Sequence, residues 1–449
     1  MSTDTKPDPQ SDENIGGRTR WVGAALLVLT ASFILVKTGR DALYFQGRGL
    51  FDLPYAYFGI TIASVPMAMG TLELMRRLGP RTARLVLPML AAVALLIYVP
   101  FASEGGGVVN TLFFVLVPTV WGVLFSLSWL LAADLFEGRS RVVVAASYAR
   151  LGASSLLGGV LGAAIARAMS GSIEPKSFVL FGAAGLVLAS SIMAAAQGSF
   201  LAPTISGKEI RPEARQEPKI GLADYKATLT GPYSSILLAI AWAAALTGVF
   251  VEFQFYLAAA TSGSDGQTNA GFFANFYLAL NGGALFVQLV IMPRLQRWVG
   301  VHGSLLALPL VLLGGAVALI FVGGSAGIRS GIRVAEGGIK SSIHRANWEQ
   351  AYLPLGQARR STAKIIIDGM GARFGEALAA VLLLVWLRVW VGQNPIVGID
   401  ITWVSWTLGL AALTWIFLTR RLGRRLVEQA AADDADAEAF RVAIPLPDT

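Results

Sequence analysis

The sequence predicts an all-α membrane protein with about twelve transmembrane helices. Two observations lead to this fold class. Hydrophobic residues make up 55% of the 449 residues and charged residues only 14%, a balance that a soluble domain of this size does not need. Apolar segments of roughly 17–25 residues, the length that a helix needs to cross the hydrocarbon core, also recur along the chain.

The apolar segments form two sets of six, separated by a polar gap. We expect spans near residues 21–45, 55–75, 84–103, 108–134, 143–169 and 176–200, and again near 232–260, 270–293, 303–323, 327–347, 362–391 and 399–420. The expected organisation is a cytoplasmic N-terminal tail (1–20), a first six-helix half (21–201), a cytoplasmic connector (202–231), a second six-helix half (232–424) and a disordered cytoplasmic tail (425–449) rich in Ala, Asp and Glu.

Basic residues gather in alternate connections between the spans. Arg76 and Arg77 follow the second span and Arg139 and Arg141 follow the fourth, whereas the connection 103–108 carries no basic residue. By the positive-inside rule, both termini are expected in the cytoplasm. The net charge of +8 is therefore a signal of membrane orientation, and no nucleic acid polymer is expected as a partner.

An internal repeat links the two sets of spans. Residues 149–152 read Ala-Arg-Leu-Gly in the fifth span, and residues 372–375 read Ala-Arg-Phe-Gly in the eleventh. Such coincidences are expected of a duplicated six-helix unit, with two pseudo-symmetric halves packed about an axis along the membrane normal, which is the major facilitator architecture. The glycines of the fifth span are expected to allow close helix packing.

The composition also excludes several classes of chemistry. Cysteine is absent and only two histidines occur, so disulfides, thiolate nucleophiles and histidine metal clusters are not expected. The chain shows no constellation of catalytic residues. We therefore expect neither an enzyme nor a bound cofactor or metal.

The first span ends in a stretch that carries three charged residues at membrane depth. Each charge at the bilayer centre costs roughly 3 kcal/mol, so these residues must pair, face water or bind a ligand. Arg40 and Asp41 point about 100° apart on a helix and are not expected to pair with each other. Lys37 and Asp41 can pair, which would leave Arg40 for an anionic substrate. Alternatively, all three lie at the outer interface with their stems snorkelling outward.

The tenth span carries a charged stripe. Its members recur every three or four residues and so share one helical face: Arg329, Arg333, Glu336, Lys340 and His344. Such a face is too costly against lipid, so we expect it to look into the bundle or a water-filled cavity. Either it serves a substrate or gating role, or it is a salt-bridged structural seam in which Glu336 pairs with Arg333 and Lys340.

Other spans add further charges. Glu252 in the seventh span is either the partner of a basic residue elsewhere or a proton carrier. In the eleventh span, Arg373 lies five residues after Asp368 and three before Glu376, so pairing with Glu376 is the easier geometry. Its repeat-mate Arg150 has no acidic neighbour in the fifth span and is expected to be the better anion ligand.

Three stretches stand out together: Lys37-Thr38-Gly39-Arg40-Asp41; Val251-Glu252; and the series Lys340-Ser341-Ser342-Ile343, Glu349, Tyr352-Leu353-Pro354-Leu355, Lys364 and Ile367-Asp368-Gly369. They resemble the ATP/ADP translocase (nucleotide transporter) family of plastids and obligate intracellular bacteria and its relatives in free-living bacteria. The resemblance covers most of the membrane region and implies that Arg40 stands where the family has a substrate-handling lysine. Tyr256 and Trp348 replace two further lysines of that family, and no acidic residue precedes Trp121, so the site is less charged.

We therefore expect a multi-pass transporter of the bacterial inner membrane that exchanges an organic anion, such as a nucleotide or another phosphorylated metabolite, by alternating access. Its expected partners are a small anionic solute and the lipid bilayer, and it is expected to act as a monomer. The expected substrate ligands are Lys37, Arg40, Arg150, Arg333, Lys340 and Arg373, and the expected charge-coupling residues are Asp41, Glu252, Glu336, Asp368 and Glu376. Two alternatives stay open: a proton-coupled carrier or exporter of a non-nucleotide solute, and a membrane scaffold or assembly factor with purely structural charges.

Overall fold

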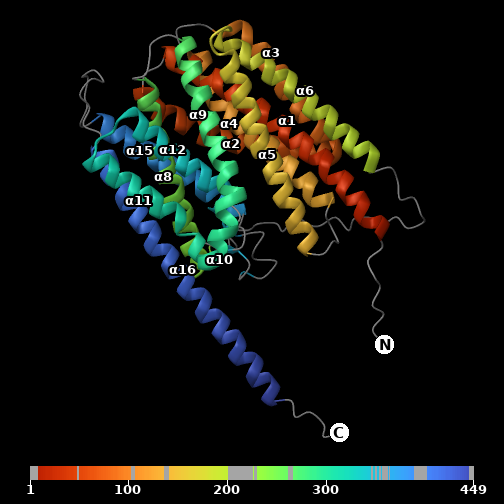
Figure 1. Cartoon of the computed structure of the whole chain (residues 1–449), viewed down its shortest axis with the longest axis vertical. Helices are drawn as coiled ribbons and strands as arrows, with labels where there is room; N and C mark the ends of the chain where they lie inside the picture. The colour runs from red at the N-terminus through yellow and green to blue at the C-terminus, as the bar shows by residue number, and fades with distance from the viewer. Residues whose placement is uncertain are drawn as a thin grey trace. The chain divides into compact units, whose positions relative to one another are not determined.

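The computed structural model describes residues 9–47, 50–102, 107–135, 141–200, 226, 230–260, 266–344, 347–348, 351–352, 355, 363, 365–388 and 402–443. The regular structure of these residues is helical throughout, and they contain no strand (Figure 1). The predicted all-α class is therefore confirmed. The predicted connector, 202–231, lies almost entirely outside the described residues.

The first set of helices follows the predicted spans. It consists of α1 (Pro9–Gly47), α2 (Leu53–Leu78), α3 (Pro80–Tyr98), α4 (Val108–Leu135), α5 (Arg141–Met169) and α6 (Pro175–Phe200), with short 3-10 helices at Leu50–Asp52 and Val99–Phe101. Only Gly79 separates α2 from α3. Its φ of 78° lies in the region that favours glycine, and Pro80 then begins the next helix.

The second set is less regular than the first. It consists of α8 (Ser234–Ala260), α9 (Gly266–Phe286), α10 (Met292–Ser304), α11 (Ala307–Phe321), α12 (Ala326–Ile339), α15 (Ala372–Trp386) and α16 (Thr402–Ala443). Among the described residues, π-helical segments adjoin these helices at Val287–Ile291, Lys340–His344 and Ile365–Gly371. Each adds residues to a helical turn and so shifts the face that later side chains occupy.

Within the described residues, ten helical segments are long and apolar enough to cross a membrane. Each corresponds to one predicted span. The two predicted spans without such a segment are 303–323, where α11 is apolar but has only 15 residues, and 327–347, where the 14 residues of α12 include Arg329, Arg333 and Glu336.

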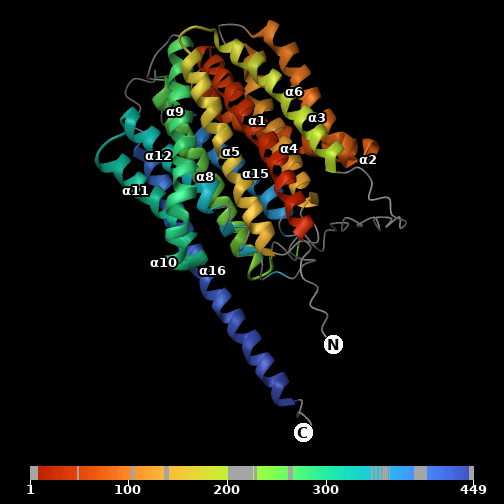
Figure 2. The same cartoon turned by 45° about the vertical axis from the view of Figure 1, so that its right-hand side comes forward.

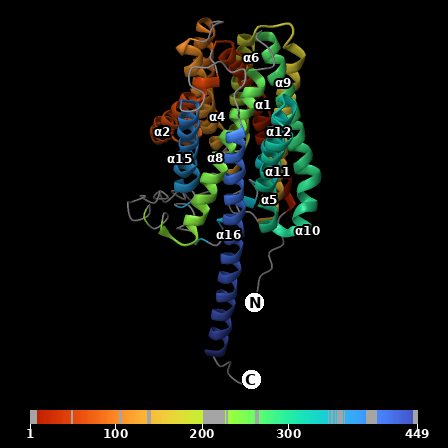
Figure 3. The same cartoon turned by 90° about the vertical axis from the view of Figure 1, so that its left-hand side faces the viewer.

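The end of the chain corrects one prediction. Residues 425–449 were expected to be disordered, but α16 continues as a helix to Ala443 (Figure 3). Residues 428–439 consist of Ala, Glu, Gln and Asp only. Alanine, glutamate and glutamine are strong helix formers, and a helix that is already nucleated by a packed segment extends through such residues at little cost.

The chain divides into two compact units. Unit 1 comprises Met1–Ile210, Phe253–Leu289 and Ser325–Gly338, and therefore contains α1 to α6, the end of α8, α9 and nearly all of α12. Within it, α1 packs between α5 and α6, and α5 runs beside α9 (Figures 1 and 2). The core includes Leu26, Trp121, Leu151, Val179 and Leu186.

Unit 2 comprises Arg211–Glu252, Val290–Gly324 and Ile339–Thr449. In it, α11 packs along the first part of α16 (Figure 3). Gly409 of α16 faces Ala316 of α11 across this contact.

The repeat-mate helices α5 and α15 each pack glycines against the first helix of their set. In unit 1, a Cβ on Gly158 or Gly162 would collide with the backbone of α1 at Leu27 or Ala31. In unit 2, a Cβ on Gly375 would lie 3.1 Å from the Cα of Trp242 on α8. The predicted role of the span 5 glycines in close packing is confirmed, whereas the division into two sequential halves stays a prediction.

Candidate functional site

The charged residues at the end of the first span lie in the interior of unit 1. Arg40 is 4% exposed and Asp41 is 0% exposed. Arg40 donates from Nε to Asp41 Oδ1 at 2.6 Å, and its Nη2 donates to the same oxygen. The expectation that these neighbours do not pair, with Arg40 left over, is therefore wrong. The long arginine stem bends back to its neighbour because burial favours any arrangement that neutralises both charges.

Two tyrosines from distant parts of the sequence complete the hydrogen bonding of Asp41. Tyr277 of α9 donates its hydroxyl to Asp41 Oδ2. The hydroxyl of Tyr256 on α8 accepts from Arg40 Nη2 at 3.2 Å and donates to Asp41 Oδ2 at 3.4 Å. All four residues are buried and belong to unit 1. We call Arg40, Asp41, Tyr256 and Tyr277 the buried charge cluster.

Aromatic rings surround the buried charge cluster. The guanidinium carbon of Arg40 lies 4.2 Å from the ring centroid of Phe114, and the Lys37 ammonium lies 4.7 Å from that of Tyr277. Phe45 packs on Tyr256 with ring centroids 4.9 Å apart. Ring faces attract cations, and the apolar wall keeps water away, so the charges interact more strongly here than they would in water.

Sequence reasoning did not assign Tyr256, Tyr277 or Phe114 to the site. Tyr256 was noted only as a replacement for a lysine of the ATP/ADP translocase family. The sequence does place these tyrosines within apolar spans. Because a buried phenol hydroxyl needs a hydrogen-bond partner, this position indicates that each tyrosine contacts a polar group. The spacing along the chain did not indicate which partner that would be.

Arg150 lies apart from the buried charge cluster. Its side chain is exposed, and it shares a face of α5 with Leu157 and Leu161, which are also exposed. A long basic side chain on an apolar helix face is the arrangement that suits the membrane–water interface. Its predicted role as the better anion ligand stays a prediction.

The charged stripe of the tenth span begins in α12. Arg333 pairs with Glu336, which is 1% exposed, as one of the open alternatives expected. Beyond Ile339 the chain forms the π-helical turn Lys340–His344, which rotates the following residues. Lys340 is exposed and His344 is buried; that they share the face of Glu336 stays a prediction.

Asp368 in unit 2 holds two aromatic side chains. Its Oδ1 accepts from the indole Nε1 of Trp348 at 2.9 Å and from the Tyr352 hydroxyl at 2.7 Å. Trp348 also stacks on His344, with ring centroids 5.7 Å apart, and His344 meets the edge of Trp415. This arrangement fixes the rings relative to the carboxylate.

The remaining predicted site residues vary in exposure. Arg373 pairs with Glu376 at 2.6 Å, which confirms the expected partner, but their side chains are 40% and 28% exposed. Glu252 is half-buried within α8. The roles predicted for these residues stay predictions.

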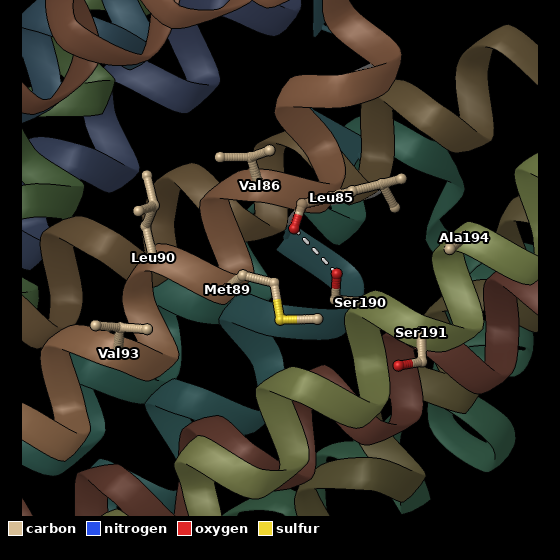
Figure 4. A pocket seen from close by; sticks show the side chains of 8 residues that line it. All are labelled: Leu85, Val86, Met89, Leu90, Val93, Ser190, Ser191 and Ala194. Carbon is tan, nitrogen blue, oxygen red and sulfur yellow. Dashed lines mark hydrogen bonds between the residues drawn. The ribbon is translucent and has the colours of Figure 1, made fainter.

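A groove of about 370 Å³ lies between α3 and α6 in unit 1 (Figure 4). Its lining is almost wholly apolar and consists of Leu85, Val86, Met89, Leu90, Val93, Ser190, Ser191 and Ala194. The Ser190 hydroxyl donates to the Leu85 carbonyl at 3.0 Å and so has its hydrogen bond within the protein. Both helices are candidate membrane spans, and this lining suits acyl chains rather than an anionic solute.

No protein-family model and no curated protein matches this sequence. Solved structures do match. A crystal structure of the nucleoside transporter NupG superposes with a TM-score of 0.58 at 10% identity, over 91% of this chain and 99% of that chain. A point-mutant form of NupG superposes with a TM-score of 0.57 at 12% identity and the same coverage.

The chain shares its fold with NupG. This likeness agrees with the predicted all-α fold of many membrane-spanning helices. At 10% to 12% identity it concerns the fold alone. The resemblance to the ATP/ADP translocase family therefore stays a prediction.

Proposed function

We propose that this protein is a secondary transporter that carries a small organic anion across the membrane by alternating access. The observation that carries the proposal is the buried charge cluster, which lies within a membrane-spanning part of α1 and recruits donors from α8 and α9. Ionisable residues at membrane depth are costly and usually serve substrate or ion pathways. The fold shared with a nucleoside transporter supports the same conclusion.

The charges around the cluster favour an anionic solute. Arg40 pairs with Asp41, and the Lys37 ammonium lies against the ring of Tyr277, so two cationic side chains lie close together here. A nucleotide, or another phosphorylated metabolite with a ring, would suit both the cations and the surrounding aromatic side chains. Solutes related to nucleosides are therefore the first to test.

The hydrogen bonding of Asp41 favours exchange over proton symport. Arg40 and Tyr277 donate to it directly, so its oxygens already have partners within the protein. Release of these contacts needs a group that replaces Asp41 on its donors, so binding of a counter-solute is the simpler route to reorientation. Glu252 is the candidate proton carrier of the alternative, a proton-coupled transporter.

The scaffold alternative has less support. It needs Lys37, Arg40, Glu252 and Lys340 to be saturated within a closed core, whereas Lys340 is exposed. We propose further that the transporter is a monomer in a bacterial inner membrane with both termini in the cytoplasm. These points rest on the distribution of basic residues and on the family resemblance.

The test is uptake of labelled ADP, ATP and adenosine by proteoliposomes, with and without the same solute inside. We expect uptake of a nucleotide that depends on internal solute and is lost in Arg40→Gln. Arg76→Gln is the matched control, because Arg76 is 76% exposed on α2. Failure to take up any of these solutes, or normal uptake by Arg40→Gln, would contradict the proposal. Uptake driven by a proton gradient without internal solute would favour the symport alternative.

A further inference from the structure

We propose that Asp41 is an internal substitute for the anionic group of the solute. In this proposal, the Asp41 carboxylate pairs with the Arg40 guanidinium while the carrier is empty. When the solute binds, one of its carboxylate or phosphate oxygens replaces Asp41 in this pair. The inference rests on the transport function proposed above and deepens it. It assigns the residue that competes with the solute and the reason why transport is an exchange.

The geometry is that of an anion site that is already filled. The two oxygens of Asp41 accept from Arg40 Nε, Arg40 Nη2 and the hydroxyls of Tyr256 and Tyr277. These donors come from three helices that are far apart in the sequence. A guanidinium and phenol hydroxyls suit the oxygens of a phosphate or carboxylate equally well. The donor set therefore fits an external anion as well as it fits Asp41.

Neither member of the ion pair can be left without a counter-charge. Arg40 is 4% exposed and Asp41 is 0% exposed, so water does not compensate their separation. Asp41 therefore leaves Arg40 only when another anion replaces it. An arriving solute supplies that anion, whereas an empty carrier has no substitute.

Lys37 offers Asp41 a second partner. It lies four residues before Asp41, which is one helical turn on the same face of α1. Its ammonium already sits 4.7 Å from the ring centroid of Tyr277, the residue that donates to Asp41. When Arg40 turns to the solute, Asp41 moves toward Lys37, and both buried charges remain compensated.

The same exchange of partners releases a link between helices. Arg40 and Asp41 lie on α1, whereas Tyr256 and Tyr277 lie on α8 and α9, which belong to the second predicted half. While Asp41 is paired with Arg40, the hydrogen bonds of the two tyrosines to this pair connect α8 and α9 to α1. Displacement of Asp41 by a solute weakens this link, so the loaded carrier opens there more readily than the empty one.

The first experiment measures binding to the purified full-length protein by calorimetry, with ADP, inorganic phosphate and adenosine as probes. Asp41→Asn removes the internal competitor and keeps the side-chain shape. We expect its affinity for ADP to rise at least tenfold, with a smaller rise for phosphate and no change for adenosine. The control is Glu73→Gln, which removes a carboxylate paired with Arg76 and Arg77 on the surface. An unchanged or weaker affinity for ADP in Asp41→Asn would overturn the proposal.

The second experiment reports on the link itself and needs no solute. The chain has no cysteine, so Phe45→Cys creates a single thiol beside Tyr256 whose reaction with a maleimide can be timed. We expect labelling to be several-fold faster with ADP, in Asp41→Asn, and in the double variant Tyr256→Phe and Tyr277→Phe. The tyrosine variant keeps the ion pair and guards against misfolding of Asp41→Asn.

The two proposals fail in different ways. Unchanged labelling in the tyrosine double variant, while wild-type uptake is intact, would overturn the role of Asp41 alone. Absence of binding and uptake for every probe would overturn the transport function, even if labelling changed.

In Lys37→Gln we expect weaker ADP binding and slower exchange, because Asp41 then lacks its second partner. Unaltered ADP binding and exchange in Lys37→Gln would contradict the partner switch.

Discussion

Arg40 donates to the carboxylate of Asp41, its immediate neighbour on α1, with Nε 2.6 Å from Oδ1. The pair lies within a segment that is long and apolar enough to span a membrane. Its hydrogen bonds to Tyr256 and Tyr277 connect residues more than two hundred positions apart in the chain. This relationship makes the first span both a structural element and the candidate solute site.

Asp41→Ala should strongly destabilise the protein. The substitution leaves the Arg40 charge in the interior without its carboxylate, and breaking a buried pair costs about 3–5 kcal/mol. We expect a large fall in the melting temperature of the detergent-purified protein. The double variant Arg40→Met and Asp41→Leu should recover most of the stability but not transport, because neither charge of the pair remains. A double variant as unstable as Asp41→Ala would show that the pair is needed for more than charge compensation.

Gly158→Ala should loosen the contact between α1 and α5. The added Cβ would meet the backbone of Leu27, which cannot rotate away. Overpacking of this kind costs about 1–3 kcal/mol. Gly122→Ala on α4 is the matched control, since no atom lies within 4 Å of its Cβ position and alanine favours helices. Equal melting temperatures for the two variants would contradict the packing argument.

The two arginine–glutamate pairs in the second set of helices should differ in their contribution to stability. Arg333→Ala removes the partner of Glu336, which is 1% exposed, whereas Arg373→Ala removes a partner from a side chain that is 28% exposed. We expect the loss from Arg373→Ala to stay within about 1 kcal/mol and that from Arg333→Ala to be clearly larger. Thermal unfolding of both variants under one condition tests this order, and the reverse order would refute it.

Asp368→Ala should disturb unit 2 more than Tyr352→Phe. The tyrosine variant loses one hydrogen bond, worth about 0.5–1.5 kcal/mol, and leaves Trp348 anchored to Asp368. The aspartate variant releases both rings at once. A double-mutant cycle on Asp368 and Tyr352, read by thermal unfolding, should give a coupling energy clearly different from zero. A zero coupling energy would mean that the two side chains do not act together.

Some elements of the site could be read from the sequence and others could not. The pairing of Arg373 with Glu376 was predictable because residues three apart on a helix are always neighbours. The pairing of Arg40 with Asp41 was not, because it depends on how a long side chain bends and on donors from α8 and α9. The π-helical turn Lys340–His344 also escaped prediction, because the expected stripe assumed regular α-helical spacing through this segment.

The sequence by itself determined where the helices run and that they belong to a membrane protein. Hydropathy over about twenty residues is a local property, and it decides whether a segment enters the bilayer. The tertiary structure alone decided which charges meet. Burial raises the cost of an uncompensated charge, so Arg40 and Asp41 adopt the arrangement that their neighbours from distant helices permit, and no local pattern encodes that choice.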